Sequence, residues 1–272
     1  MPRVVITGAA GSIGGKLRRH FESLGWPLVL LDRDAKGDPA IRAADLAVWE
    51  EGWVASLEGA DALLLLAGVP YPHASWAEIV PNNLDLVVNV YEAAVRARVR
   101  RVVFASSNWV LGGRRFEDGP LRPDTPPHPV NAYGMAKLVG ERLGKSYAER
   151  HGLSVICFRI GYAQREPGNR PGAHMNWGLW GQTMWLSDRD LCQGFEKAVL
   201  APDSVRFAVL NLMSANPGMR WDLEETRRLI GYQPQDGAAP VVTPEIEAEE
   251  AVSRHGWAAM ESIRDFLMRR RR

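Results

Sequence analysis

The chain has 272 residues, 46% of them hydrophobic and 24% charged, with a formal net charge of +1. The length suits one large domain or one domain with a smaller lobe, and the near-neutral charge argues against a nucleic-acid partner. The longest purely apolar run, about residues 62–67, is far too short to span a bilayer, so we expect no membrane partner.

The first informative stretch is residues 4–14, where an apolar run ends at Thr7 and a helical pattern begins a few residues later. Glycines separate the two at a Gly-x-x-Gly-x-x-Gly spacing. Glycine lets a backbone turn approach a pyrophosphate at a helix N-terminus, where the helix dipole favours an anion. A plain glycine-rich turn is the alternative. The residues expected to hold the pyrophosphate are Gly8, Gly11, Ser12, Ile13 and Gly14.

Asp32 ends the next apolar run, residues 28–31, and lies 18 residues beyond Gly14. A dinucleotide-binding unit places an acid near this position to hold the adenosine ribose hydroxyls. Because a carboxylate repels a 2′-phosphate, Asp32 favours NAD over NADP. Arg33 leaves NADP open, since an arginine there could pair with that phosphate.

Two further short stretches are expected at the cofactor. Asp45-Leu46 follows the second crossover, where the aspartate could bond the adenine amino group or serve as a turn residue. Leu66, Ala67 and Gly68 end the strand expected over 62–67. Small residues there would let the backbone approach the cofactor, although a plain strand-ending glycine is the alternative.

Strands and helices alternate through the first 160 residues. Short continuous apolar runs are typical of a parallel sheet covered on both faces, and alternation with helices predicts a Rossmann-type doubly wound α/β fold. Ligands bind such folds at the carboxyl ends of the strands. The expected strands are 4–7, 28–31, 62–67, 102–105 and 154–158, and the expected helices are 12–24, 82–98 and 132–151.

After residue 161 the alternation breaks. Residues 162–184 are rich in glycine and aromatic residues, which suggests a lid or substrate wall, with a surface loop as the alternative. Beyond them we expect a helix over 187–200, a strand over 205–212, a helix over 222–230 and a helical tail over 243–271 that Gly256 could interrupt. We assign 1–161 to the Rossmann domain and 162–272 to a small C-terminal substrate lobe, with 185–212 returning to the core.

Tyr133 and Lys137 are four residues apart on an expected helix, so both project from one face. An ammonium beside a phenol favours the phenolate and would lower the pKa of the phenol from about 10 toward the range of a general base. The strand over 102–105 runs into Ser106 and Ser107, and a hydroxyl there can hold a substrate oxygen against the tyrosine. We predict Ser107, Tyr133 and Lys137 as catalytic residues and Ser106 as a turn residue.

Taken together, these motifs resemble those of extended short-chain dehydrogenases/reductases of the NAD-dependent epimerase/dehydratase type. The resemblance covers essentially the whole chain and includes Asn83 and the Gly-Tyr-Gln-Pro sequence at 231–234. It implies an oxidoreductase acting on a CH–OH group, with Ser107, Tyr133 and Lys137 as its triad. It also implies that Lys137 and Tyr133 touch the cofactor and that Asn83 and Ile160 belong to the cofactor site.

Within that superfamily the chain is most similar to uronate dehydrogenases, which oxidise the anomeric hydroxyl of a hexuronic acid to a lactone with NAD. The likeness lies in residues 104–108, 159–161 and 185–187. Four residues depart from that family: Trp109 stands where it has histidine, Pro70 and Tyr162 where it has serines, and Trp180 where it carries a carboxylate-binding arginine. The resemblance therefore implies the chemistry but not recognition of a uronate.

We expect NAD-dependent oxidation of a hydroxyl of a small sugar or sugar acid, with hexuronates as poor substrates. A nucleotide-sugar epimerase or dehydratase and a non-catalytic NAD(H)-sensing protein are the alternatives. The candidate substrate residues are Ser107, Asn108, Trp109, Tyr133, Tyr162, Arg165, Arg170, His174 and Trp180.

The remaining expectations concern metals and cellular setting. The six histidines show no metal-ligand spacing, so we expect no metal. The two cysteines, Cys157 and Cys192, form no Cys-x-x-Cys motif and fit a reducing cytoplasm. We expect a cytoplasmic homo-oligomer.

Overall fold

A seven-stranded parallel sheet forms the centre of the protein in the computed structural model, which describes residues 1–165 and 168–269. The strand order is β3-β2-β1-β4-β5-β6-β7. The strands are β1 (Val4–Thr7), β2 (Leu28–Asp32), β3 (Ile41–Ala43), β4 (Ala62–Leu65), β5 (Arg101–Ser107), β6 (Ser154–Ile160) and β7 (Phe207–Leu212). The predicted doubly wound Rossmann-type fold is confirmed.

The sheet changes its direction of growth at β1. Val4 pairs with Leu28 of β2 on one side and with Ala62 of β4 on the other. The chain first builds outward through β2 and β3 and then crosses back to β4. The carboxyl ends of β1 and β4 therefore flank the crevice in which doubly wound folds bind ligands.

Helices cover both faces of the sheet. The α-helices are α1 (Ser12–Ser23), α2 (Glu51–Ala55), α3 (Trp76–Ile79), α4 (Leu86–Arg96), α5 (Ala132–His151), α6 (Gly178–Thr183), α7 (Asp188–Leu200), α8 (Glu224–Ile230) and α9 (Pro244–Arg269). A π-helix, η1 (Val80–Asp85), leads into α4, and a 3₁₀ segment, η2 (Asn108–Arg114), follows β5.

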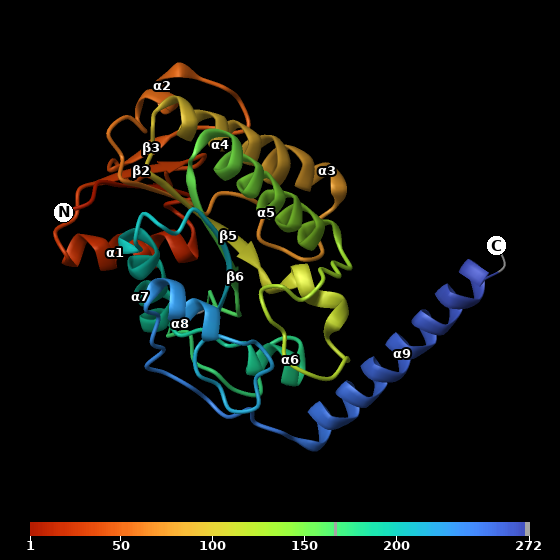
Figure 1. Cartoon of the computed structure of the whole chain (residues 1–272). Coiled ribbons are helices and arrows are strands. Elements are labelled where there is room, and N and C mark those ends of the chain that lie inside the picture. The colour runs from red at the N-terminus through yellow and green to blue at the C-terminus, as the bar shows by residue number, and fades with distance from the viewer. Residues whose placement is uncertain (166–167, 270–272) are drawn as a thin grey trace.

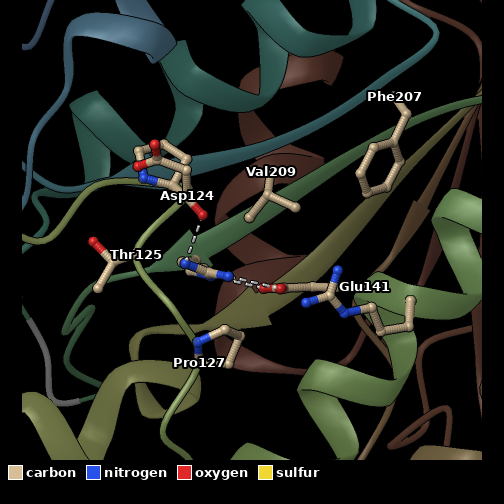
Figure 2. Close-up of a pocket in the computed structure, with 9 residues that line it drawn as sticks. Asp124, Thr125, Pro127, Glu141, Phe207 and Val209 are labelled. Carbon is tan, nitrogen blue, oxygen red and sulfur yellow. Dashed lines mark hydrogen bonds and ion pairs between the residues drawn. The ribbon is translucent and has the colours of Figure 1, made fainter.

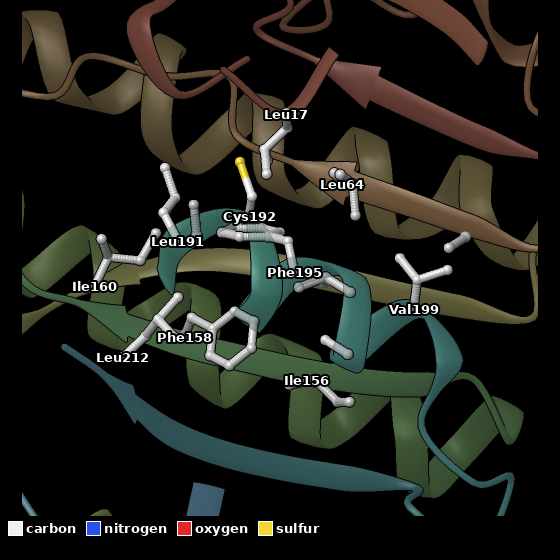
Figure 3. Close-up of a cluster of buried hydrophobic side chains, with 14 of the residues drawn as sticks. Leu17, Leu64, Ile156, Phe158, Ile160, Leu191, Cys192, Phe195, Val199 and Leu212 are labelled. Atoms are coloured by element: carbon white, nitrogen blue, oxygen red, sulfur yellow. The ribbon is translucent and has the colours of Figure 1, made fainter. Parts of the chain in front are cut away.

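The core on one face of the sheet joins α1, α7 and α8. Leu17 of α1 and Phe195 of α7 are fully buried there, and Phe195 meets Phe158 of β6 edge-on (Figure 3). Cys192 lies in the same layer. Apolar positions at helical spacing on α7 thus hold this helix flat against the sheet.

The core on the opposite face joins α2, α4 and α5, and α5 approaches the sheet closely. A Cβ on Gly140 would lie 2.4 Å from the ring of Phe104, and one on Gly144 would lie 2.7 Å from the hydroxyl of Tyr91. A Cβ on Gly134 would lie 2.4 Å from a backbone carbonyl. The absence of side chains at these three glycines lets α5 lie against β5, so its N-terminal turns reach the end of that strand.

Several elements differ from the sequence-based expectation. The strand expected over 62–67 ends at Leu65, because the hydroxyl of Thr7 accepts the N–H groups of Leu66 and Ala67 at 3.2 and 3.3 Å in place of ladder bonds. The helix expected over 82–98 begins as η1 and ends at Arg96. Elements that were not predicted are β3, α2, α3, η2 and α6.

The tail contains one long helix, α9, which continues through Gly256 without interruption. Its first half packs on α6, and its far end extends away from the body (Figure 1). The expected end of the tail at 271 lies outside the described residues. Within the described ranges, no helix is both long and apolar enough to cross a bilayer.

Candidate active site

A cavity of about 1110 Å³ opens at the carboxyl ends of the central strands. Loops after β1, β2, β4, β5 and β6 and the start of α5 form its walls. The residues predicted from the sequence that line it are Gly8, Gly11, Ser12, Ile13, Gly14, Asp32, Arg33, Asp45, Leu46, Leu66, Ala67, Gly68, Ser107, Asn108, Trp109, Tyr133, Lys137, Ile160, Tyr162, Arg165 and His174.

The turn between β1 and α1 is packed so closely that side chains are excluded. A Cβ on Gly14 would lie 2.2 Å from the carbonyl oxygen of Gly8, and Gly8 itself has a φ of +71°. Gly11 is the N-cap of α1 and has no side chain to cap it. The first N–H groups of α1 are therefore left to a ligand, and such a cradle suits the pyrophosphate of a dinucleotide.

Asp32 at the end of β2 is joined to this cradle. Its carboxylate accepts the N–H of Ala10 at 3.0 Å. Two cations lie beside it: Arg33 donates to the side-chain oxygen of Asn82 at 2.7 Å, and Lys36 donates to the carbonyl of Ala10 at 3.1 Å. A carboxylate and two cations thus share the part of the cavity where a ribose would bind.

Ser107, Tyr133 and Lys137 meet in the same cavity. Ser107 is the last residue of β5, whereas Tyr133 and Lys137 lie one turn apart in α5. Asn131 caps that helix, accepting the N–H of Gly134 at 2.7 Å. All three side chains are buried, and the ammonium of Lys137 lies 5.6 Å from the centroid of the Tyr133 ring. The arrangement can hold a hydroxyl substrate between a serine and a tyrosine.

Burial acts on the acid–base groups of this trio. It raises the pKa of Tyr133, while a hydrogen bond with Ser107 and the charge of Arg165 act in the opposite direction. It also lowers the pKa of Lys137 to about 8. The expectation that Lys137 brings the phenol pKa below its usual value is therefore wrong for this structure, because removal from water outweighs the hydrogen bond with Ser107 and the charge of Arg165.

A buried ion pair lies behind the catalytic residues. Glu141, one turn beyond Lys137 on α5, accepts two hydrogen bonds from Arg159 of β6 at 2.9 Å (Figure 2). The same carboxylate accepts the hydroxyl of Ser106 in β5 at 2.7 Å. The expectation that Ser106 is a turn residue is wrong, because Ser106 is a buried residue of β5 whose side chain belongs to this network. The network joins α5 to the two strands that end at the cavity.

Two indoles form one wall of the cavity. Trp109, at the start of η2, donates its backbone N–H to the hydroxyl of Ser107 at 3.2 Å. The Trp177 ring meets it edge-to-face, with centroids 4.9 Å apart. Trp177 has a φ of +72°, a left-handed conformation that costs about 1–3 kcal/mol for a bulky residue.

Arg165 brings a positive charge to the wall. Its guanidinium lies 4.4 Å from the centroid of the Tyr71 ring and donates to the Tyr71 hydroxyl at 2.5 Å. The imidazole ring of His73 stacks on the Tyr71 ring, with the two centroids 5.5 Å apart. His174 also lines the cavity. The substrate end is thus aromatic and carries the positive charge of Arg165.

Three predicted site residues do not line the cavity. Asn83 is buried and holds the loop after β4 through both of its amide atoms, which bond to the backbone of Val69 at 2.9 and 3.0 Å. Arg170 is exposed on the loop surface. Trp180 is a correction: it packs against Trp221, 4.5 Å away, in a separate apolar cluster, because α6 turns that face away from the cavity.

Sequence reasoning missed other lining residues. Lys36, Asn82, His73, Gln164 and Asn176 all line the cavity. Asn82 stands next to Asn83 in the sequence and lines the cavity, whereas Asn83 does not. Lys36 follows Asp32 by four residues, and its position after a strand end was a usable signal. Across the described ranges, no cluster of His, Cys, Asp and Glu is suited to hold a metal.

A family model and curated relatives match the chain. The model of the NAD dependent epimerase/dehydratase family matches residues 4–164. An L-arabinose 1-dehydrogenase (NAD(P)(+)) from Haloferax volcanii is 36% identical over 263 residues, which cover 89% of this chain and 100% of that protein. A uronate dehydrogenase from Pseudomonas syringae pv. tomato is 33% identical over 241 residues, covering 87% and 82%.

A solved structure shows the same architecture. The crystal structure of uronate dehydrogenase from Agrobacterium tumefaciens has a TM-score of 0.73 and 30% sequence identity. The match covers 87% of this chain and 85% of that one.

Proposed function

The chain belongs to the NAD-dependent epimerase/dehydratase family, and from this premise we propose that it oxidises a hydroxyl group of a small sugar or sugar acid with NAD. The observation that carries the proposal is the meeting of Ser107, Tyr133 and Lys137 in the same cavity as the glycine cradle. The cradle is the part of a binding site that a pyrophosphate requires, and the trio can position and deprotonate a hydroxyl.

The residues present fit NAD. Gly8, Gly11 and Gly14 would hold the pyrophosphate, Asp32 would accept hydrogen bonds from ribose hydroxyls, and Ala67 and Gly68 would allow close approach of the dinucleotide. When bound, NAD supplies the acceptor for the hydride that leaves the substrate carbon.

The protein's own groups handle the proton. The hydroxyl of Ser107 would orient the substrate oxygen, and the phenol oxygen of Tyr133 would take the proton from it. Because burial raises the pKa of Tyr133, the phenolate needs stabilisation by positive charge. Lys137, with a pKa lowered to about 8, still carries most of its charge at pH 7 and is placed to provide it.

For the substrate we propose the anomeric hydroxyl of a free aldose, which yields a lactone. The relatives named above carry the names of an L-arabinose and a uronate dehydrogenase. Trp109 and Tyr162 line the cavity, and Trp180, which stands where the uronate family carries its arginine, is buried elsewhere. These placements support a neutral sugar over a hexuronate.

A substrate panel tests the function. Formation of NADH would be followed with L-arabinose, D-galactose, D-glucose, D-glucuronate, D-galacturonate and a sulfonated hexose. We expect net NADH formation, fastest with a neutral aldose. Epimer formation without net NADH would favour an epimerase, and NADH binding without turnover of any sugar would favour a sensor.

Tyr133→Phe separates catalysis from binding. Removing the base should lower turnover by at least about 10²-fold and leave NADH binding nearly intact, because general-base catalysis contributes about that much. Turnover would be measured by NADH absorbance and binding by NADH fluorescence. Retention of most activity by the variant would rule out Tyr133 as the base.

We also propose a cytoplasmic location and a homo-oligomeric state. Both Cys157 and Cys192 are buried, unpaired thiols, which suits a reducing compartment. Fractionation of cells tests the location, and light scattering of the purified protein tests the oligomeric state.

A further inference from the structure

Trp177 lies at the edge of the cavity in a backbone conformation that bulky residues rarely adopt. Its φ is +72°, and Gly178 follows with a φ of +54°. The indole is 40% exposed and rests edge-on against Trp109. A strained residue of this kind persists only where surrounding contacts hold it, and such residues gather at ligand sites.

One contact that holds Trp177 comes from outside the cavity. The guanidinium of Arg115 donates to the carbonyl oxygen of Trp177 at 3.3 Å and to the carboxylate of Glu250 at 2.7 Å. Each partner of this ion pair is only 18% exposed, so water and salt weaken it less than an exposed pair. Arg115 follows η2, the segment whose start carries Trp109.

The C-terminal helix α9 is packed against the same turn. Gln182 of α6 exchanges two hydrogen bonds, of 2.7 and 3.1 Å, with the backbone of Val241 just before α9 begins. The backbone at Gly178 lies so close to α9 that a Cβ there would be 3.6 Å from the Glu250 carboxylate and 3.8 Å from Ile246. The position of α9 therefore sets the position of the turn that presents Trp177.

We propose that Trp177, together with Trp109, is a specificity-determining wall on which the apolar face of the sugar ring stacks, and that the Arg115–Glu250 pair is its positioning device. The inference rests on the proposed function and names the binding surface of that same site. The side chain of Trp109 packs against the cluster that contains Tyr133, and its backbone N–H donates to the Ser107 hydroxyl, so a ring resting on this wall lies beside the reacting oxygen. The partner chemistry is a pyranose with C–H groups on one face, because an indole gives such a face contact without needing a charge.

The test compares variants with L-arabinose as the probe. Trp177→Ala should raise the KM for L-arabinose about tenfold, with kcat and the KM for NAD little changed, since an aromatic contact contributes about that much. Trp177→Phe, which keeps a smaller ring, should raise the KM for L-arabinose less than Trp177→Ala does. Glu250→Ala should also raise the KM for L-arabinose. Glu249→Ala changes the exposed neighbouring residue, so it is the matched control and should leave this KM unchanged.

A double variant shows whether Glu250 acts through Trp177. Trp177→Ala combined with Glu250→Ala should have the same KM as Trp177→Ala alone, because the wall is already lost. Independent effects that multiply would contradict the positioning role. An unchanged KM in Trp177→Ala, or a fall in kcat at constant KM, would overturn the wall.

Sugar binding is also read without turnover. L-arabinose is added to the protein–NADH complex, and its binding is followed by the change in NADH fluorescence. In Trp177→Ala the sugar concentration at the midpoint of this change should be about tenfold higher as well. Wild-type protein that binds the sugar in this titration but never oxidises it contradicts the proposed function alone. The proposed wall is contradicted if the wild type and Trp177→Ala give the same titration. It is also contradicted if L-arabinose does not change the NADH fluorescence of the wild-type complex.

Discussion

Burial pushes both titratable groups of the site toward their neutral forms. The pKa of Tyr133 is raised and that of Lys137 is lowered, in each case mainly because the side chain is removed from water. Considered singly, a neutral phenol is a poor base, and a buried ammonium is unfavourable for stability. Placed together, each makes the charge on the other less costly, as the proposed proton transfer requires.

Lys137→Met should therefore stabilise the fold while abolishing activity. At pH 7 the folded protein carries a buried ammonium, and a methionine of similar shape removes that cost, which we expect to amount to about 1–3 kcal/mol. Between pH 8 and 10.5 the unfolded chain binds the proton that the folded chain has lost, so wild-type stability rises with pH and the difference narrows.

Thermal unfolding at pH 7 and at pH 10 measures this effect. Lys145→Met on the exposed side of the same helix is the control and should change little, since Lys145 is 47% exposed and pairs with Glu149 at the surface. A Lys137→Met variant that melts below the wild type at pH 7 would contradict the assigned cost of the buried charge.

Asp32 should determine the choice between NAD and NADP. We expect kcat/KM to be higher with NAD, and Asp32→Ala to reduce that preference at least about tenfold, because hydrogen bonds to a charged group contribute about 1.5–3 kcal/mol. Arg33 and Lys36 would then be free to pair with a 2′-phosphate. Steady-state kinetics with both cofactors decides the matter, and equal or better performance of the wild type with NADP would refute the role of Asp32.

At the scale of elements, the Glu141–Arg159 pair fixes the helix that carries Tyr133 and Lys137. Both side chains are only 3% exposed, and Ser106 completes the link to β5. Removing one charge of a buried pair leaves the other charge buried without a partner. Glu141→Gln should therefore lower the free energy of unfolding by about 3–5 kcal/mol. It should also lower kcat, because α5 loses its tie to the strand that ends in Ser107.

Denaturant unfolding measures the loss. Glu149→Gln on the exposed side of α5 is the matched control and should cost well under about 1 kcal/mol, because exposed ion pairs contribute little. Replacing both partners, with Glu141→Leu and Arg159→Met, should recover most of the stability since no charge is left buried. Equal losses in Glu141→Gln and the control would show that the buried pair contributes nothing.

The cofactor end of the site could be predicted because its signals are local. A glycine spacing, an acid at a strand end and a Tyr-x-x-x-Lys turn each fit within a few residues, and a parallel sheet brings all strand ends to one edge. The substrate end of the site could not be predicted from the sequence in this way. Trp180 and Trp177 come from the same aromatic loop, yet one packs against Trp221 and the other lines the cavity. Only tertiary packing decides which way each side chain turns.

The same limit applies to short elements. In β3 only Ile41 of three residues is buried, so no apolar run marks the strand. The raised pKa of Tyr133 likewise depends on its burial in the folded protein, which spacing along a helix does not report.

At the scale of the whole molecule, NAD would join parts that are distant in sequence. The loops after β1, β2, β4 and β6 all line the cavity, so a ligand there restrains both halves of the sheet at once. NAD at about one hundred times its Kd should raise the free energy of unfolding by about 2.7 kcal/mol.

Thermal denaturation over a series of NAD concentrations tests this coupling. The melting temperature should rise with the logarithm of NAD concentration, and Tyr133→Phe should show the same rise because it leaves the cradle intact. A melting temperature independent of NAD would contradict binding at the cradle.

The glycines of α5 impose a final consequence, which concerns how this protein can be altered. Replacing helical glycine with alanine is a common way to make a protein more heat-resistant, since glycine weakens a helix by about 1 kcal/mol. At Gly134, Gly140 and Gly144 the added methyl group would meet atoms 2.4 to 2.7 Å away. The helix would have to move outward and take Tyr133 and Lys137 with it. Engineering for heat resistance should therefore leave these three positions alone, although none of them lines the cavity.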